Sequence, residues 1–76
     1  MLLEILTPDK TLYAGEVKGV QLPGTGGSFE LKENHAPIVS SLTAGTVTAR
    51  TAEGDKTFEI TGGVVEMLAN KVVVLA

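Results

Sequence analysis

The chain has 76 residues, 43% of them hydrophobic, and it contains no cysteine, so it forms neither disulfides nor thiolate metal sites. Its formal net charge of -3 provides none of the basic surface that binds phosphate backbones, and nucleic acid is excluded as an expected partner. A chain this short has room for one domain, residues 1–76, which has to be held together by its hydrophobic core.

Apolar and polar residues alternate along most of the chain, which is the period of half-buried β-strands. In chain order, the alternating apolar pairs are Leu3 and Ile5, Val20 and Leu22, Phe29 and Leu31, Val47 and Ala49, and Phe58 and Ile60. Turn-forming residues separate them at 7–10, 14–16, 23–27, 53–55, 62–63 and 70–71. No helix of ordinary length fits between these turns. The predicted fold class is therefore all-β, a sandwich or a small barrel.

Two segments depart from the alternation. Val17 and Val20 differ in parity on either side of Gly19, which predicts a β-bulge there. Further along, residues 64–68 and 72–75 are apolar on both faces, and a strand of that kind needs a cover on each side. The second cover is either a partner protein or the sandwich itself, and the sequence leaves both open.

Candidate catalytic residues are few. His35 is the only general base available at neutral pH, and Ser40 and Ser41 follow closely, but there is no GxSxG motif to position a serine nucleophile. The run Gly24–Gly27 lacks the Gly-Lys-Ser/Thr that completes a phosphate-binding loop. One histidine and scattered carboxylates predict no metal site, and no cofactor is expected. A small hydrolase centred on His35 remains an alternative.

A second alternative comes from the predicted hairpin tip at residues 53–55, followed by Lys56. This tip resembles the lysine-bearing turn of lipoyl or biotinyl carrier domains, which are small all-β modules. In those domains the modified lysine occupies the apex of the turn. Here Gly54 suits the apex better, so a carrier modified at Lys56 is the alternative reading.

Neither end of the chain predicts a segment that inserts into lipid. Glu4 interrupts the first apolar run, and the apolar stretch 72–76 is far too short to span a bilayer. We therefore expect that any association with a membrane passes through another protein.

Three ordered motifs carry a resemblance to a known family. They are the LPGTGG turn at residues 22–27, the His-Ala-Pro of residues 35–37 with the following Ser-Ser-Leu and Gly45, and Gly62-Gly63 with Val65, Glu66 and the closing Val-Leu-Ala of residues 74–76. In this order they resemble the N-terminal β-sandwich of the epsilon subunit of bacterial F-type ATP synthases, over essentially the whole chain. The resemblance implies a flattened sandwich of about ten short, mostly antiparallel strands. It also implies a non-catalytic subunit of the central stalk, which fastens the gamma subunit to the ring of c subunits and couples ion translocation to ATP synthesis.

The resemblance also implies contact residues. Gly24, Thr25, Gly26, Gly27 and Ser28 match the loop that faces the c-ring, whereas Thr7, His35 and Ser40 match positions on the side that faces gamma. Residues 30–34 read ELKEN where many relatives carry Pro-Gly before the histidine, so the path of that loop is expected to differ.

Length is a further departure, because most relatives continue into a pair of helices where this sequence stops at Ala76. The resemblance then implies a naturally short form or a truncated one, with no nucleotide bound and no helix-mediated inhibition by this chain. The expected location is peripheral, on the cytoplasmic face of the bacterial inner membrane.

Overall fold

A computed structural model describes the whole chain, residues 1–76, as one sheet of seven β-strands. The strands are β1 (Leu2–Leu6), β2 (Thr11–Glu16), β3 (Gly19–Gly24), β4 (Gly27–Lys32), β5 (Ile38–Thr51), β6 (Gly54–Leu68) and β7 (Lys71–Leu75). Their order in the sheet is β2-β1-β7-β6-β5-β3-β4. Only β1 and β7 pair in parallel, and all other neighbours are antiparallel. The predicted all-β class is confirmed, but the strands number seven rather than about ten.

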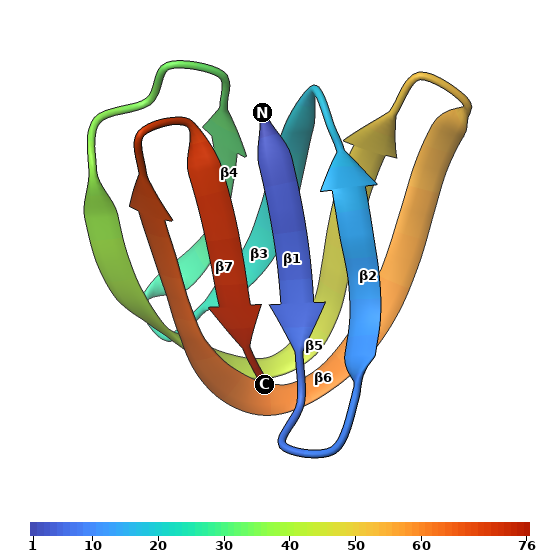
Figure 1. Cartoon of the computed structure of the whole chain (residues 1–76). Coiled ribbons are helices and arrows are strands. Elements are labelled where there is room, and N and C mark those ends of the chain that lie inside the picture. Colours follow the sequence, from blue (N-terminus) through green and yellow to red (C-terminus); the bar gives the residue numbers. More distant parts are fainter.

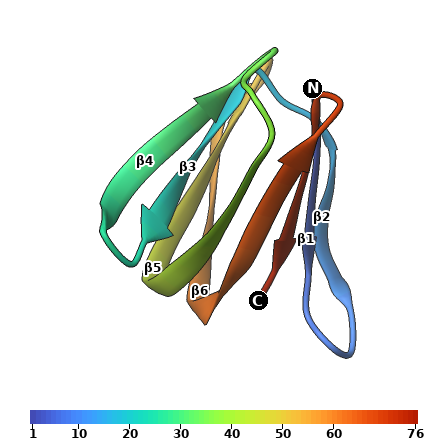
Figure 2. The same ribbon diagram turned by 90° about the vertical axis from the view of Figure 1, so that its left-hand side faces the viewer.

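The difference in strand number comes from β5 and β6, which are 14 and 15 residues long. Both strands curve through a U and so belong to two layers (Figure 1). The first layer contains β2, β1, β7 and the arms 64–68 and 38–43, and the second contains β4, β3 and the arms 45–51 and 54–60. Figure 2 shows the two layers facing each other from the side. A sheet folded in this way is a β-sandwich, and β5 and β6 each contribute one arm to each layer.

Gly62 and Gly63 form the corner of β6, where the sequence predicted a turn. The ladder with β5 continues through both glycines, so the predicted turn is wrong. Their φ angles of 143° and 137° lie in a region that side chains disfavour. A Cβ atom on Gly63 would also collide with the carbonyl oxygen of Leu75 in β7. Glycine at this corner therefore lets β6 bend while the end of β7 passes against it.

The bulge predicted at Gly19 is also wrong, because β2 ends at Glu16 and a new strand, β3, begins at Gly19. Val17 and Lys18 carry it from one layer to the other, and their amides donate hydrogen bonds to carbonyl oxygens outside these two strands at 2.8 and 2.7 Å. Residues 14–16, predicted as a turn, are the end of β2. The change in parity thus marks a new strand in the opposite layer, whose inner face points the other way.

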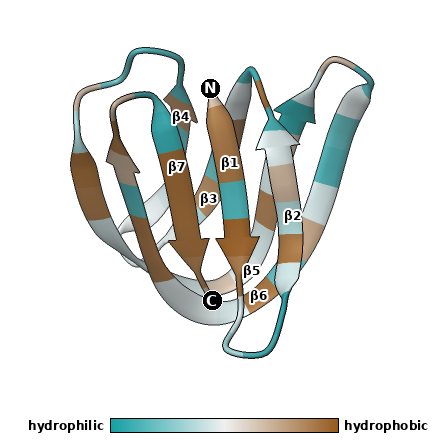
Figure 3. Ribbon diagram, viewed as in Figure 1, coloured by the Kyte–Doolittle hydropathy of each residue, from teal (hydrophilic) through white to brown (hydrophobic).

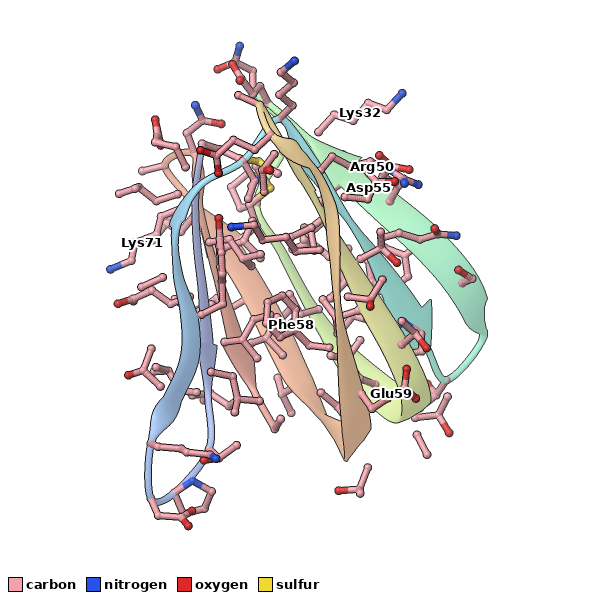
Figure 4. The ribbon with its side chains drawn as sticks, turned by 90° about the vertical axis from the view of Figure 1, so that its right-hand side faces the viewer. Lys32, Arg50, Asp55, Phe58, Glu59 and Lys71 are labelled. Atoms are coloured by element: carbon pink, nitrogen blue, oxygen red, sulfur yellow. The ribbon has the colours of Figure 1, made fainter.

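The core lies between the two layers and buries no polar or charged side chain. Its largest fully buried members are Leu3, Ile5, Val20, Leu22, Leu31, Val47, Val65, Met67, Val72 and Val74. The alternation predicted from the sequence is confirmed in β1, β3 and β5, where the flanking apolar residues are buried and the residue between them is more exposed. Tyr13 of β2 and Phe58 of β6 pack together with ring centroids 5.5 Å apart, and Figure 4 shows Phe58 between the layers. Each fully buried Leu or Val stabilises such a core by about 1.5–3 kcal/mol.

Candidate functional site

The outer surface of the first layer gathers the hydrophobic side chains that the fold leaves exposed. The five large exposed hydrophobic residues of the chain are Leu2, Val39, Val64, Leu68 and Leu75. The register places all of them on this surface, because directly paired residues on neighbouring strands point to the same side. We call this surface, together with Glu4, Glu66, Lys71 and Val73 between the five, the outer apolar face.

Strand β6 shows how one segment serves both the core and this face. Val65 and Met67 point inward and are buried, whereas Val64 and Leu68 point outward and are 42% and 62% exposed. Figure 3 shows the hydrophobic colouring spread over β1, β7 and the last arm of β6. The alternative that the sequence left open is thereby resolved: the second layer covers the inner face of residues 64–68, and no part of the chain covers the outer face.

The charges on the outer apolar face are unevenly paired. The Lys71 ammonium lies 3.2 Å from the Glu4 carboxylate. Glu66 takes part in none of the ion pairs or side-chain hydrogen bonds of the chain. Two shallow depressions open beside it, and Glu66 and Leu68 line both. An exposed apolar patch with a few polar groups has the composition of a protein interface.

The outer face of the second layer is polar instead. Arg50 lies near the β5–β6 hairpin at one end of this layer and donates hydrogen bonds to both carboxylate oxygens of Glu30 at 3.3 Å, to Asp55 at 2.6 Å and to the side-chain oxygen of Gln21 at 3.2 Å. The hydrogen bond to Glu30, and after it the one to Asp55, raise the pKa of Arg50 above its ordinary value. Figure 4 shows Arg50 beside Asp55, with Lys32 extending away from them. The four strands of this layer are thus bridged by one guanidinium, and the two outer faces differ in character.

The glycine-rich segment forms the tight turn that the sequence predicted. Gly24 pairs with Gly27 across the β3–β4 hairpin, and the turn consists of Thr25 and Gly26. The Thr25 amide donates a hydrogen bond to a β5 carbonyl oxygen at 3.2 Å. Ser28 already belongs to β4, and its hydroxyl accepts a hydrogen bond from the Gln21 amide at 3.1 Å. The turn is confirmed, and its contact with a c-ring stays a prediction.

Thr7, His35 and Ser40 do not come together. Thr7 lies in the β1–β2 turn, where its hydroxyl accepts the Lys10 amide at 3.2 Å. His35 lies exposed in the β4–β5 loop, and Ser40 is half-buried within β5. In Figure 1 the β1–β2 turn is at the bottom of the molecule and the β4–β5 loop at the top. Any partner that contacted all three would have to extend along the length of the sandwich, and their role in contacting gamma remains a prediction.

The geometry around His35 does not support the hydrolase alternative. The imidazole Nδ1 lies 2.8 Å from the carbonyl oxygen of the adjacent Ala36, which is its only hydrogen-bond contact. The Ser40 hydroxyl instead faces the Ser41 carbonyl oxygen at 3.5 Å. No base–nucleophile pair is formed, and no carboxylate orients the imidazole.

The position of Lys56 does not support the carrier alternative either. Lys56 is paired with Ala49 inside the β5–β6 ladder, and the hairpin turn is formed by Ala52 and Glu53. Its ammonium lies 5.9 Å from the centre of the Tyr13 ring and 3.8 Å from the Glu53 carboxylate. The lysine therefore lies along the side of the sandwich rather than at an apex that projects into solvent.

Two further features of the structure bear on its chemistry. No group of three or more His, Asp or Glu side chains lies close enough together to hold a metal ion. The structure also holds no helix of sufficient length and hydrophobicity to traverse a bilayer.

Comparison with known proteins agrees with this arrangement. Residues 1–76 match the family described as the β-sandwich domain of the ATP synthase delta/epsilon chain. The ATP synthase epsilon chain of Chlorobaculum tepidum is 36% identical over 74 residues, which cover 96% of this chain and 84% of that protein. The epsilon chain of Syntrophomonas wolfei is 38% identical over 76 residues, 99% of this chain and 56% of that protein. The chain thus spans little more than half of some curated relatives and most of others.

Solved structures share the fold at lower sequence identity. A chain of the Euglena gracilis mitochondrial ATP synthase, in a structure of OSCP, F1 and the c-ring, superposes with a TM-score of 0.90 at 17% identity. The match covers 97% of this chain and 48% of that one. A chain in the central stalk and c-ring of the Tetrahymena thermophila mitochondrial ATP synthase gives 0.82 at 17% identity, with 97% and 60% covered. Because its whole length matches this family and the two epsilon chains are 36% and 38% identical to it, the chain belongs to the family of ATP synthase delta/epsilon β-sandwich domains.

Proposed function

We propose that residues 1–76 act as the β-sandwich domain of a non-catalytic rotor subunit of an F-type ATP synthase. In this role the domain fastens the gamma subunit to the c-ring, so that ion translocation through the ring drives ATP synthesis. The observation that carries the proposal is the outer apolar face of a chain whose relatives are epsilon chains. A face of this kind binds a neighbour through burial of apolar surface and needs no catalytic group.

The build of the sandwich suits a part that transmits torque. Strands β5 and β6 run through both layers and are paired from residues 38 and 67 to the hairpin at 51 and 54, except at Ala44 and Thr61 in the corner. A load applied to one layer therefore passes to the other through continuous backbone and its hydrogen bonds, rather than through side-chain packing alone. Such rigidity lets two neighbours on different surfaces turn together.

The partners in this proposal are gamma on the outer apolar face and the c-ring at the β3–β4 turn, residues 24–28. Both structurally similar chains come from complexes that contain the c-ring, and one of these complexes consists of the central stalk with the c-ring. We further propose that the domain is peripheral, on the cytoplasmic face of a bacterial inner membrane, and that the chain binds no nucleotide. These assignments follow from the family, and the apolar face supports only the contact with gamma.

Complex formation with purified gamma subunit tests the proposal. Wild-type chain is mixed with gamma and analysed by gel filtration, beside a Leu68→Ser/Leu75→Ser double variant and a Lys32→Gln control on the polar face. Leu68 and Leu75 are 62% and 55% exposed, so their loss leaves folding nearly unchanged. We expect wild type and the Lys32 variant to co-elute with gamma and the double variant to elute alone. Separate elution of the folded wild-type chain contradicts the proposal.

A further inference from the structure

We propose that Glu66 is the specificity-determining charge of the outer apolar face and that the protein covering this face places a Lys or Arg side chain opposite it. The inference rests on the proposed function, because it describes the partner of the same surface. It adds the chemistry that the partner must present.

Glu66 lies in the middle of the apolar side chains. On its own strand, Val64 and Leu68 flank it on the same face, two residues away in each direction. Across the ladders it pairs with Val39 of β5 and with Val73 of β7. A partner that buries these four neighbours also removes the Glu66 carboxylate from water.

The other carboxylates of this layer's outer surface already have cations. Glu4 has the Lys71 ammonium at 3.2 Å, and Glu16 at the edge has the N-terminal ammonium at 3.8 Å. Glu66 has no cation within ion-pair distance. Its carboxylate is therefore available to form an ion pair with a neighbouring protein. Of the two depressions that Glu66 lines, one already contains Lys71, and the other, toward Pro37, is lined by no cation and leaves room for a long basic side chain beside Leu68.

Burial of an unpaired carboxylate is far more unfavourable than burial of the same carboxylate in a hydrogen-bonded ion pair. Covering Glu66 with an apolar surface that lacks a cation therefore costs more free energy than covering it with a surface that has Lys or Arg at this point. The aliphatic stem of such a residue also packs on Leu68 and Val39. The carboxylate thus discriminates between partners that the apolar residues alone accept equally.

The test compares binding of purified gamma subunit to wild type, Glu66→Gln and Glu4→Gln by isothermal titration at low and high salt. Glutamine keeps the shape of glutamate and removes the charge. We expect Glu66→Gln to weaken binding about tenfold or more and to lose most of the salt dependence. Glu4→Gln is the matched control, because it removes a carboxylate that is paired within the chain, and we expect less than about a threefold change.

The possible results separate the two proposals. If wild type does not bind gamma, both the proposed function and this inference are overturned. If wild type binds and Glu66→Gln binds equally well at both salt concentrations, the inference alone is overturned. A Glu66→Lys variant provides the second check: we expect it to abolish binding by repulsion of the partner's cation, and unchanged affinity contradicts the inference. Thermal unfolding of each variant verifies that the exposed substitutions leave the fold intact.

Discussion

The side-chain oxygen of Asn70 accepts a hydrogen bond from the backbone amide of Asn34 at 2.9 Å, across 36 residues of sequence. Both residues have left-handed backbone conformations, with φ of 62° and 63°. The backbone oxygen of Asn70 also accepts the Leu2 amide at 3.2 Å. One residue of the β6–β7 turn therefore holds both β1 and the loop that carries His35.

Replacement of Asn70 by glycine should release that loop. Glycine keeps the positive φ but removes the side-chain acceptor, so we expect a loss of about 1 kcal/mol in unfolding free energy and faster hydrogen exchange at the Asn34 amide. Amide exchange followed by NMR measures the local effect. Asn70→Asp keeps the acceptor and should retain slow exchange. Equal exchange of the Asn34 amide in wild type and Asn70→Gly contradicts the role of this bond.

Gly63→Ala should be severely destabilising. The added Cβ collides with the Leu75 carbonyl oxygen, and the φ of 137° is unfavourable for alanine. We expect a loss of more than about 2 kcal/mol in urea unfolding. Gly26→Ala is the matched control, because nothing lies within 4 Å of its added Cβ, and it should stay within about 0.5 kcal/mol of wild type. Similar unfolding midpoints for the two variants would show that β7 can move away from this corner.

Arg50→Lys should lower the melting temperature, since an ammonium cannot reach Glu30, Asp55 and Gln21 at once as the planar guanidinium does. The raised pKa of Arg50 means that its stabilising charge persists at all pH values up to the strongly alkaline range and is lost only as the pH rises through that pKa. Salt is therefore the useful variable, and high salt should reduce the difference between the variants.

Thermal unfolding at two salt concentrations measures this effect. Lys32→Gln removes a nearby cation that forms no ion pair, and it should leave the melting temperature unchanged. If Arg50→Lys and Lys32→Gln melt alike at low salt, the Arg50 cluster contributes nothing measurable.

Ser28→Arg and His35→Glu test the two predicted contact regions separately. Both side chains are exposed, so we expect unfolding free energies within about 0.5 kcal/mol of wild type. Ser28→Arg should reduce incorporation into a complex with the c-ring, and His35→Glu should reduce the affinity for gamma. Pull-down with each purified component measures this. Normal assembly of either folded variant removes that residue from the predicted contacts.

Much of the fold could be predicted because strand alternation is local. Leu3 with Ile5 and Val20 with Leu22 are buried as the pattern indicated, since a period of two forces alternate side chains to opposite faces. The turn at Thr25 and Gly26 was predictable for a similar reason, because glycine is needed where the chain reverses. The same local rule predicted a turn at Gly62 and Gly63, where the chain instead bends without reversing.

The candidate site was only partly predictable. Residues 64–68 and 72–75 showed an excess of apolar character, but the sequence could not say whether a second layer or a partner covers it. Nor could it bring Leu2 and Val39 to the same surface as Leu75, because that depends on the register of β1, β7, β6 and β5.

By itself, the sequence determined the all-β class, the alternating core and the motifs at residues 22–27 and 35–37 that placed the chain in its family. These are properties of short segments, and hydrophobic periodicity and turn chemistry express them directly. The tertiary structure alone decided that β5 and β6 fold one sheet into two layers, leaving an apolar outer face with Glu66 unpaired at its centre. That arrangement depends on pairing between strands far apart in the chain, and pairing is set by how the two layers bury their inner faces together.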